Sequence, residues 1–155
     1  MKHAVFRPPF IEEGPALPTQ VVIPNKLQKL EFNATTPEGA CRVTVVTGEM
    51  QAGVQASSTG NWVNQSATIK ALVDPTLTPG QFRKSTATAS VSQVNANSNA
   101  FPTNTQWLLD DVQATYDDEA GQVQLTVDVT CSASGNGTSV STGRILFQVT
   151  TLAKV

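Results

Sequence analysis

The stretch Gln106–Ser132, QWLLDDVQATYDDEAGQVQLTVDVTCS, decides the fold because it contains two alternating runs around a short acidic turn. In both runs, apolar side chains occupy every second position, which is the period of a strand with one buried face. The turn, Asp117–Gly121, is short and ends in glycine, so the pattern predicts an antiparallel β-hairpin. The apolar positions are Val112, Ala114, Tyr116, Val123, Leu125, Val127, Val129 and Cys131.

The rest of the chain repeats this pattern in shorter pieces. Clusters of Gly, Pro, Asn, Asp and Ser separate the alternating runs and predict turns or loops at 35–39, 57–60, 74–80, 95–105 and 134–137. Strands are predicted at 20–23, 27–33, 41–47, 54–56, 62–73, 82–94 and 140–155. No stretch has the period of a helix longer than a turn or two. We therefore predict an all-β fold, an antiparallel β-sandwich (jelly-roll or Ig-like) or a barrel, with an extended Pro-rich N-terminal arm.

The first 19 residues differ from the rest in composition. The chain has 155 residues, enough for one domain with an extended end, so we assign 20–155 to a single β-domain and 1–19 to the arm. Prolines favour extended backbone there, and the apolar side chains between them would be a liability if left exposed. We expect the arm to dock on its own domain or on a neighbouring subunit. The contact residues would be Phe6, Pro8, Pro9, Phe10, Ile11 and Leu17.

Charge argues against a nucleic-acid partner, and the lack of long apolar runs argues against a membrane partner. Only 14% of residues are charged, against about 25% in an average protein, and the net charge is −2. The one adjacent cation pair, Arg83–Lys84, is interpreted as a solvated strand end, so we expect no nucleic-acid partner. There is no apolar run of 18 residues and no secretory signal peptide, so we expect no membrane partner and synthesis in the cytoplasm.

Residue types that carry catalysis and metal binding are sparse. The single histidine, His3, lies in the arm, which disfavours nucleophilic triads and a zinc site, and we predict a non-enzymatic protein without a cofactor. Cys41 and Cys131 are expected to be buried free thiols; a disulfide would require facing strands in register. The Asp117–Glu119 turn is interpreted as solvated, with calcium binding as the alternative.

One aromatic residue suggests a ligand site. Trp62 follows Gly60 and Asn61 at a loop-to-strand junction, and Phe101 lies in the polar loop 95–105. Exposed aromatic rings are typical platforms for sugars, so Trp62 and Phe101 are the candidate ligand platform. The alternative for Trp62 is a lid over the end of the β-domain.

Together, the apolar arm and the low-charge β-domain predict a self-assembling structural protein. The most plausible form is a capsid decoration (cement) or tail component of a phage-like virion, which binds copies of itself and other shell subunits through the arm. A glycan- or ligand-binding β-sandwich module is the alternative. A small enzyme is the third hypothesis, and the lack of histidines makes it the weakest.

Overall fold

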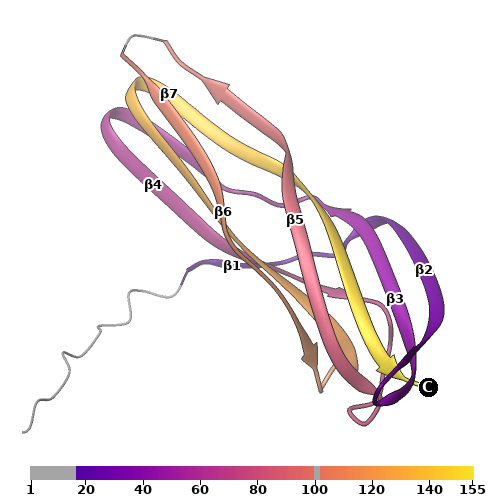
Figure 1. Cartoon of the computed structure of the whole chain (residues 1–155). Coiled ribbons are helices and arrows are strands. Elements are labelled where there is room, and N and C mark those ends of the chain that lie inside the picture. The colour runs from indigo at the N-terminus through magenta and orange to yellow at the C-terminus, as the bar shows by residue number, and fades with distance from the viewer. Residues whose placement is uncertain (1–16, 100–101) are drawn as a thin grey trace, which may run out of the picture.

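A computed structural model describes residues 17–99 and 102–155 (Figure 1). The predicted all-β class is confirmed, because this part of the chain contains strands and no helix. The strands form one curled mixed sheet with the shape of a half-barrel. They are β1 (Thr19–Val21), β2 (Asn25–Thr36), β3 (Gly39–Met50), β4 (Gln55–Val73), β5 (Phe82–Asn97), β6 (Asn104–Asp117) and β7 (Gln122–Lys154).

The half-barrel is built around β7, which is 33 residues long. Its first part pairs with β4 on one side and β6 on the other, and its last part pairs with β3 on one side and β5 on the other. The predicted hairpin is confirmed at the start of β7, where Asp117 of β6 pairs with Gln122. Four of the other six strands therefore depend on β7 for their ladders.

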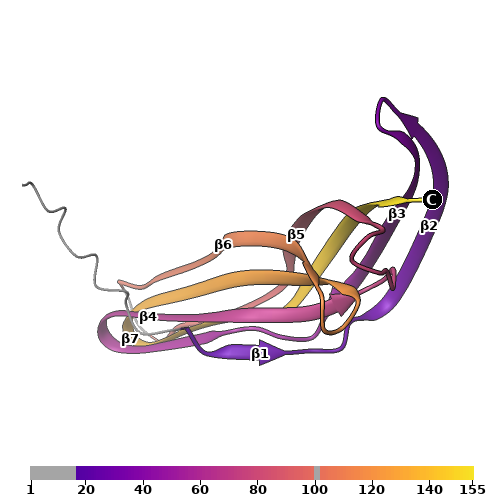
Figure 2. The same ribbon diagram turned by 90° about the horizontal axis from the view of Figure 1, so that it is seen from below.

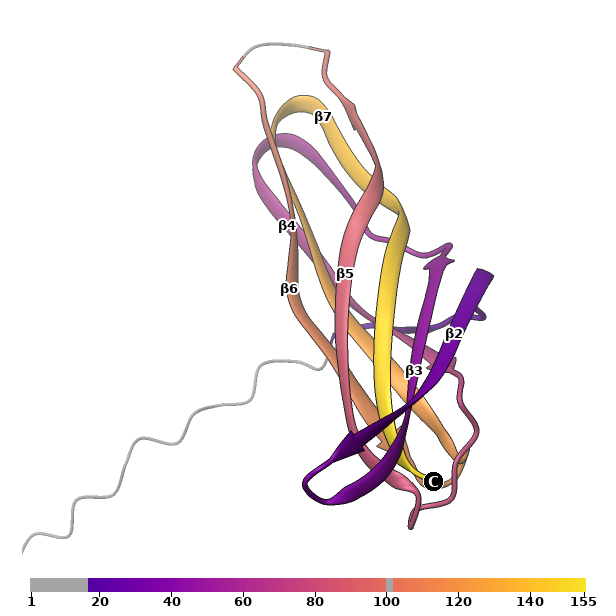
Figure 3. The same cartoon turned by 45° about the vertical axis from the view of Figure 1, so that its right-hand side comes forward.

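Two predicted turns are bends inside continuous strands. β4 and β7 both turn back at the same end of the molecule (Figures 1 and 3). Cross-strand pairing continues through the bend, where Gly60 lies opposite Gly135, so 57–60 and 134–137 do not end their strands. Gly135 and Gly137 have φ values of 108° and 66°. Glycine adopts such values without the steric cost of a Cβ atom.

The alternating residues of the predicted hairpin form the core. Leu125, Val127 and Val129 are fully buried, which confirms that this face of β7 points inward. After the bend, the returning part of β7 contributes Val140, Ile145 and Val149 to the same cluster. One strand therefore supplies both walls of the core.

One margin of the sheet departs from the purely antiparallel pairing that the sequence predicted. β1 runs parallel to β4, with Thr19 opposite Thr68, which makes the sheet mixed. At the other margin, β2 pairs with β3, and this hairpin curls away from the rest of the sheet (Figure 2). None of the secondary structure in 17–99 and 102–155 is a helix long and apolar enough to cross a membrane.

Candidate interaction surface

Strand β2 exposes apolar side chains at the margin of the sheet. Its sequence, NKLQKLEFNATT, alternates charged and apolar residues in the middle. Leu30 and Phe32 lie opposite Val45 and Val43 of β3, and they are 61% and 49% exposed. These four residues form the outer strip, an apolar surface on the face of the β2–β3 hairpin that points away from the core. Exposed apolar surface of this kind is typical of contacts with other molecules.

The opposite face of β2 carries an ion pair. Lys29 Nζ lies 3.2 Å from Glu31 Oε1, and the Thr44 hydroxyl donates to the same oxygen at 3.3 Å. The Lys29 ammonium holds the pKa of Glu31 below its ordinary value, with the Thr44 hydrogen bond acting in the same direction. Lys29 also lies 3.9 Å from Asp74 Oδ2. Lys29 and Glu31, the two charged residues in the regular part of β2, are therefore on the face opposite to the outer strip.

A second acidic group anchors the start of β2. Glu49 of β3 has a side chain only 7% exposed, and its Oε1 lies 3.0 Å from Lys26 Nζ. Its Oε2 lies 3.8 Å from Arg144 Nε. The hydrogen bond from Lys26 is the main reason that the pKa of Glu49 is below its ordinary value, while its burial acts in the opposite direction. This contact ties the irregular start of β2, between Asn25 and Gln28, to β3 and β7.

The predicted turn at 35–39 is confirmed at the end of this hairpin, where Thr36 pairs with Gly39. The Thr36 hydroxyl accepts the backbone N–H of Glu38 at 3.3 Å and donates to the carbonyl of Gly39 at 3.1 Å. Gly39 has a φ of 116°, which suits glycine. The turn is thus fixed by its own hydrogen bonds.

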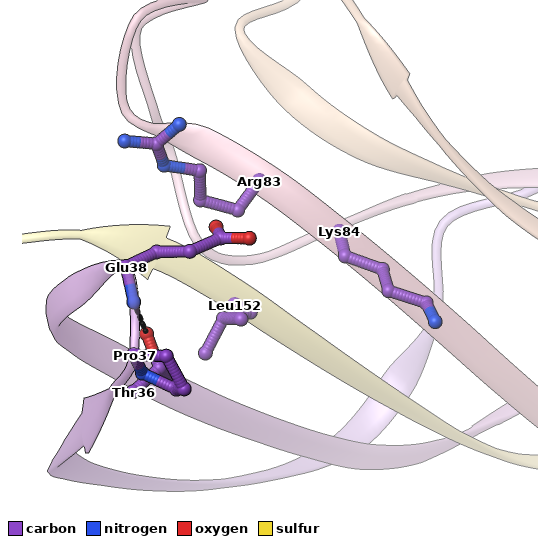
Figure 4. Close-up of a pocket in the computed structure, with 6 residues that line it drawn as sticks. All are labelled: Thr36, Pro37, Glu38, Arg83, Lys84 and Leu152. Carbon is purple, nitrogen blue, oxygen red and sulfur yellow. Dashed lines mark hydrogen bonds between the residues drawn. The ribbon is translucent and has the colours of Figure 1, made fainter.

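This turn faces the first residues of β5 across an open pocket of about 480 Å³. Leu152 of β7 lies between the two walls, and the Glu38 carboxylate extends toward the side of Arg83 (Figure 4). The lining combines the apolar Leu152 with two cations and one carboxylate, Glu38. A net positive charge beside apolar surface suits a partner segment with apolar and acidic side chains. The lining residues are Thr36, Pro37, Glu38, Arg83, Lys84 and Leu152.

Most of the predicted arm residues lie outside the described part of the chain. Leu17 is the exception, and it is 42% exposed. The next residue, Pro18, accepts a hydrogen bond from the Thr68 N–H at 2.9 Å through its carbonyl oxygen, so the chain joins the sheet there. The arm residues not described are Phe6, Pro8, Pro9, Phe10 and Ile11.

Of the two residues of the predicted ligand platform, only Trp62 lies in the described part of the chain. Trp62 is 49% exposed and lies where the register of β4 against β7 shifts, between Gly60 and Val63. Its neighbours Asn61 and Asn64 are exposed as well. Phe101 lies outside the described residues.

The acidic turn is explained by its own hydrogen bonds. Asp117 Oδ1 accepts the backbone N–H groups of Glu119 and Ala120, each at 3.0 Å, and Oδ2 accepts from Gln124 Nε2 at 3.3 Å. Within 17–99 and 102–155, no three His, Cys, Asp or Glu side chains are grouped as metal ligands.

Both cysteines are buried free thiols, as the sequence predicted. Cys131 belongs to the core, where its thiol approaches the Val54 carbonyl oxygen at 3.4 Å, and burial raises its pKa. Cys41 lies outside the core cluster, beneath the β2–β3 turn, 3.8 Å from the Thr36 hydroxyl. Only 5% of Cys41 is exposed, so it is buried although it lies on the same face of β3 as Val43 and Val45.

The outer strip is the part of this surface that the sequence did not reveal. Residues 27–33 were predicted as a strand, but the alternation of Lys29, Leu30, Glu31 and Phe32 resembles that of a strand with a buried face. The one feature of the sequence that could have suggested an exposed marginal strand was the position of residues 27–33 near the start of the β-domain, next to the arm.

Comparisons with protein-family models, with curated proteins and with solved structures found no match.

Proposed function

We propose that this chain is a non-enzymatic structural protein that assembles into a larger particle by binding neighbouring subunits through its N-terminal arm. The most plausible particle is a phage-like virion, with the chain as a capsid decoration (cement) or tail component. It would be made in the cytoplasm and end in the particle. In this role the half-barrel takes the place of the β-sandwich or barrel expected from the sequence.

The pocket between the β2–β3 turn and β5 supports this proposal most directly. Its Leu152 surface beside Arg83 and Lys84 matches a segment that carries apolar and acidic side chains in succession. The arm has such a segment, Phe10-Ile11-Glu12-Glu13. The arm of a neighbouring copy would place its apolar pair against Leu152 and its carboxylates near the two cations. Burying a few hundred Å² of apolar surface at about 25 cal/mol per Å² contributes several kcal/mol before ordering costs.

The test is the native mass of the full chain and of a chain that begins at Leu17, measured by light scattering across a concentration series. The cut at residue 16 preserves the hydrogen bond from Thr68 to Pro18 and the whole of β1. We expect the truncated chain to keep its β-sheet circular dichroism but to lose the arm-dependent oligomer. Equal masses at all concentrations would contradict the proposal.

Point variants separate the arm contact from nonspecific effects of deletion. Phe10→Ala with Ile11→Ala is expected to weaken the oligomer, and so is Arg83→Glu with Lys84→Glu. The matched control is Lys2→Ala with His3→Ala, in the same arm but outside the segment Phe10-Ile11-Glu12-Glu13, which should leave the mass unchanged. If the control weakens assembly as much as the Phe10 and Ile11 pair, the pocket is not the docking site.

Exposure of Trp62 favours the second candidate function, a glycan- or ligand-binding module. A half-exposed indole next to Asn61 and Asn64 combines a stacking surface with neutral hydrogen-bonding groups, as sugar sites do. A glycan array with the wild-type chain and with Trp62→Ala tests this function. Binding that the substitution abolishes would support it, whereas an array without any signal would remove it.

A further inference from the structure

We propose that two copies of this chain also pair edge to edge through β2, antiparallel and around a two-fold axis that passes beside Leu30. This inference does not depend on the arm. It rests on the free margin of β2, on the outer strip and on the placement of Lys29 and Glu31 in β2.

The backbone of β2 is regular where a second strand would add. Its ladder with β3 runs without a register shift from Gln28 to Thr36, and the only irregularity lies between Asn25 and Gln28. Among the described strands, β2 pairs with β3 alone, so the other margin of this run has backbone groups free for another strand. Strand addition at such a margin uses main-chain hydrogen bonds.

The outer strip limits the register of such a pair. Residues directly opposite in an antiparallel ladder point to the same face. Leu30 and Phe32 have even residue numbers, so the outer strips of the two copies share one face only if even-numbered residues of β2 lie opposite each other. We describe each such register by the sum of the two opposite residue numbers, which is then even. Leu30 opposite Leu30 of the second copy gives a total of 60, and it places Phe32 opposite Gln28. Residues 28–32 of both copies then lie inside the regular run of β2.

The positions of Lys29 and Glu31 favour a total of 60 over the neighbouring even totals of 58 and 62. A total of 58 places Lys29 opposite Lys29, and a total of 62 places Glu31 opposite Glu31; like charges directly opposite are unfavourable. A total of 60 places Lys29 of each copy opposite Glu31 of the other, so two attractive pairs form. Within one chain, Lys29 Nζ lies 3.2 Å from Glu31 Oε1, so both side chains lie on the same face of β2.

This register also gathers the exposed apolar side chains. Leu30, 61% exposed, would face its counterpart directly, and Phe32, 49% exposed, would lie diagonal to the second Leu30. Diagonal neighbours in a ladder are within reach of aromatic side chains. The outer strips of two copies would form one apolar surface across the two-fold axis.

Charge reversal tests the pairing in the full chain. Lys29→Glu and Glu31→Lys each place like charges opposite each other in their own homodimer, and we expect each to self-associate about tenfold more weakly than wild type. An equimolar mixture restores both attractive pairs, so heterodimers should dominate in native mass spectrometry. The like-charged pair within each chain is unchanged by mixing, so a merely structural role of these residues gives no heterodimer preference.

Cysteine crosslinking tests the register independently. Leu30→Cys should form a disulfide between copies under mild oxidation, because directly opposite residues have the Cα separation that a disulfide needs. Phe32→Cys is the control, since its counterpart would be four residues along the strand, about 13 Å away. A mixture of Gln28→Cys and Phe32→Cys should crosslink to each other. The wild-type chain, with both thiols buried, gives the background.

Two results would overturn the inference: charge variants that show no preference for heterodimers, or Phe32→Cys that crosslinks as fast as Leu30→Cys. Repeating the Leu30→Cys reaction with Phe10→Ala and Ile11→Ala in the same chain separates this contact from the arm. An unchanged crosslink would show that β2 pairing stands whether or not the arm proposal does.

Discussion

Gly53 is a residue at which the fold leaves no room for a side chain. An ideal Cβ atom there would lie 1.7 Å from the Thr142 carbonyl oxygen and 2.4 Å from its carbonyl carbon. The reason is that Val54, in the connection between β3 and β4, exchanges hydrogen bonds with Thr142 of β7. The Val54 carbonyl accepts the Thr142 N–H at 3.0 Å, and the Thr142 hydroxyl accepts the Val54 N–H at 3.2 Å. Gln20 also donates to the Gly53 carbonyl at 2.9 Å.

Gly53→Ala is therefore expected to lower the free energy of unfolding by about 3 kcal/mol, because backbone must shift to accept the methyl group. Gly80→Ala is the matched control, since nothing lies within 4 Å of its Cβ position, and it should change stability by no more than about 0.5 kcal/mol. Urea unfolding followed by circular dichroism measures both. Equal stabilities of the two variants would contradict this account.

Glu49 predicts a dependence of stability on pH. Its pKa is lowered in the folded chain, chiefly by Lys26, so the carboxylate contributes stability above its unfolded pKa. That contribution is lost as pH falls from the ordinary glutamate value, about 4.3, through the lowered folded value. Glu49→Gln should be less stable than wild type at pH 7, and the difference should shrink as the pH falls below about 4. Urea unfolding at several pH values provides the measurement, and a difference independent of pH would refute it.

At the scale of the element, β7 depends on its alternation. Leu125 of β7 is fully buried between β4 and β6, whereas Leu108 of β6 is 55% exposed. Leu125→Ala is expected to cost about 2–5 kcal/mol through the lost burial and the cavity, and Leu108→Ala no more than about 1 kcal/mol. Thermal unfolding by calorimetry compares them. Similar losses in the two variants would mean that the inward face of this hairpin has been misidentified.

The same contrast explains which elements the sequence predicts. The start of β7 was predicted correctly because one face is buried and the other is not, so its period of two is undisturbed. The bends at Gly60 and Gly135 were predicted as turns because glycine is usual in turns; the sequence alone does not show that pairing continues through them. β1 overlaps the strand predicted at 20–23, but its parallel pairing with the distant β4 has no local signal. For the candidate site, Trp62 was found by its position after glycine, but the outer strip needed the pairing of β2 with β3.

At the scale of the whole molecule, the sheet has a single organising strand. β5 and β6 pair only with β7 among the described strands, and β4 otherwise pairs only with the three residues of β1. A chain that ends at Gly121 is therefore expected to show no cooperative unfolding and no protected amides in hydrogen exchange. A chain that begins at Leu17 keeps every described strand and serves as the control. Cooperative unfolding of the shorter chain ending at Gly121 would contradict the central role of β7.

The position of β7 after the other six strands has a consequence for biosynthesis. A ribosome makes proteins from the N-terminus, so β3 to β6 emerge before the strand that joins them has been translated. Long-range strand pairing of this kind is slow and leaves apolar segments unpaired while it waits. The β2–β3 hairpin can pair as soon as it is made, but β5 and β6 have no partner among the described strands until β7 has been translated. We therefore expect the sheet to be completed only after β7 has been translated, because this strand comes last in the sheet and pairs with four of the others.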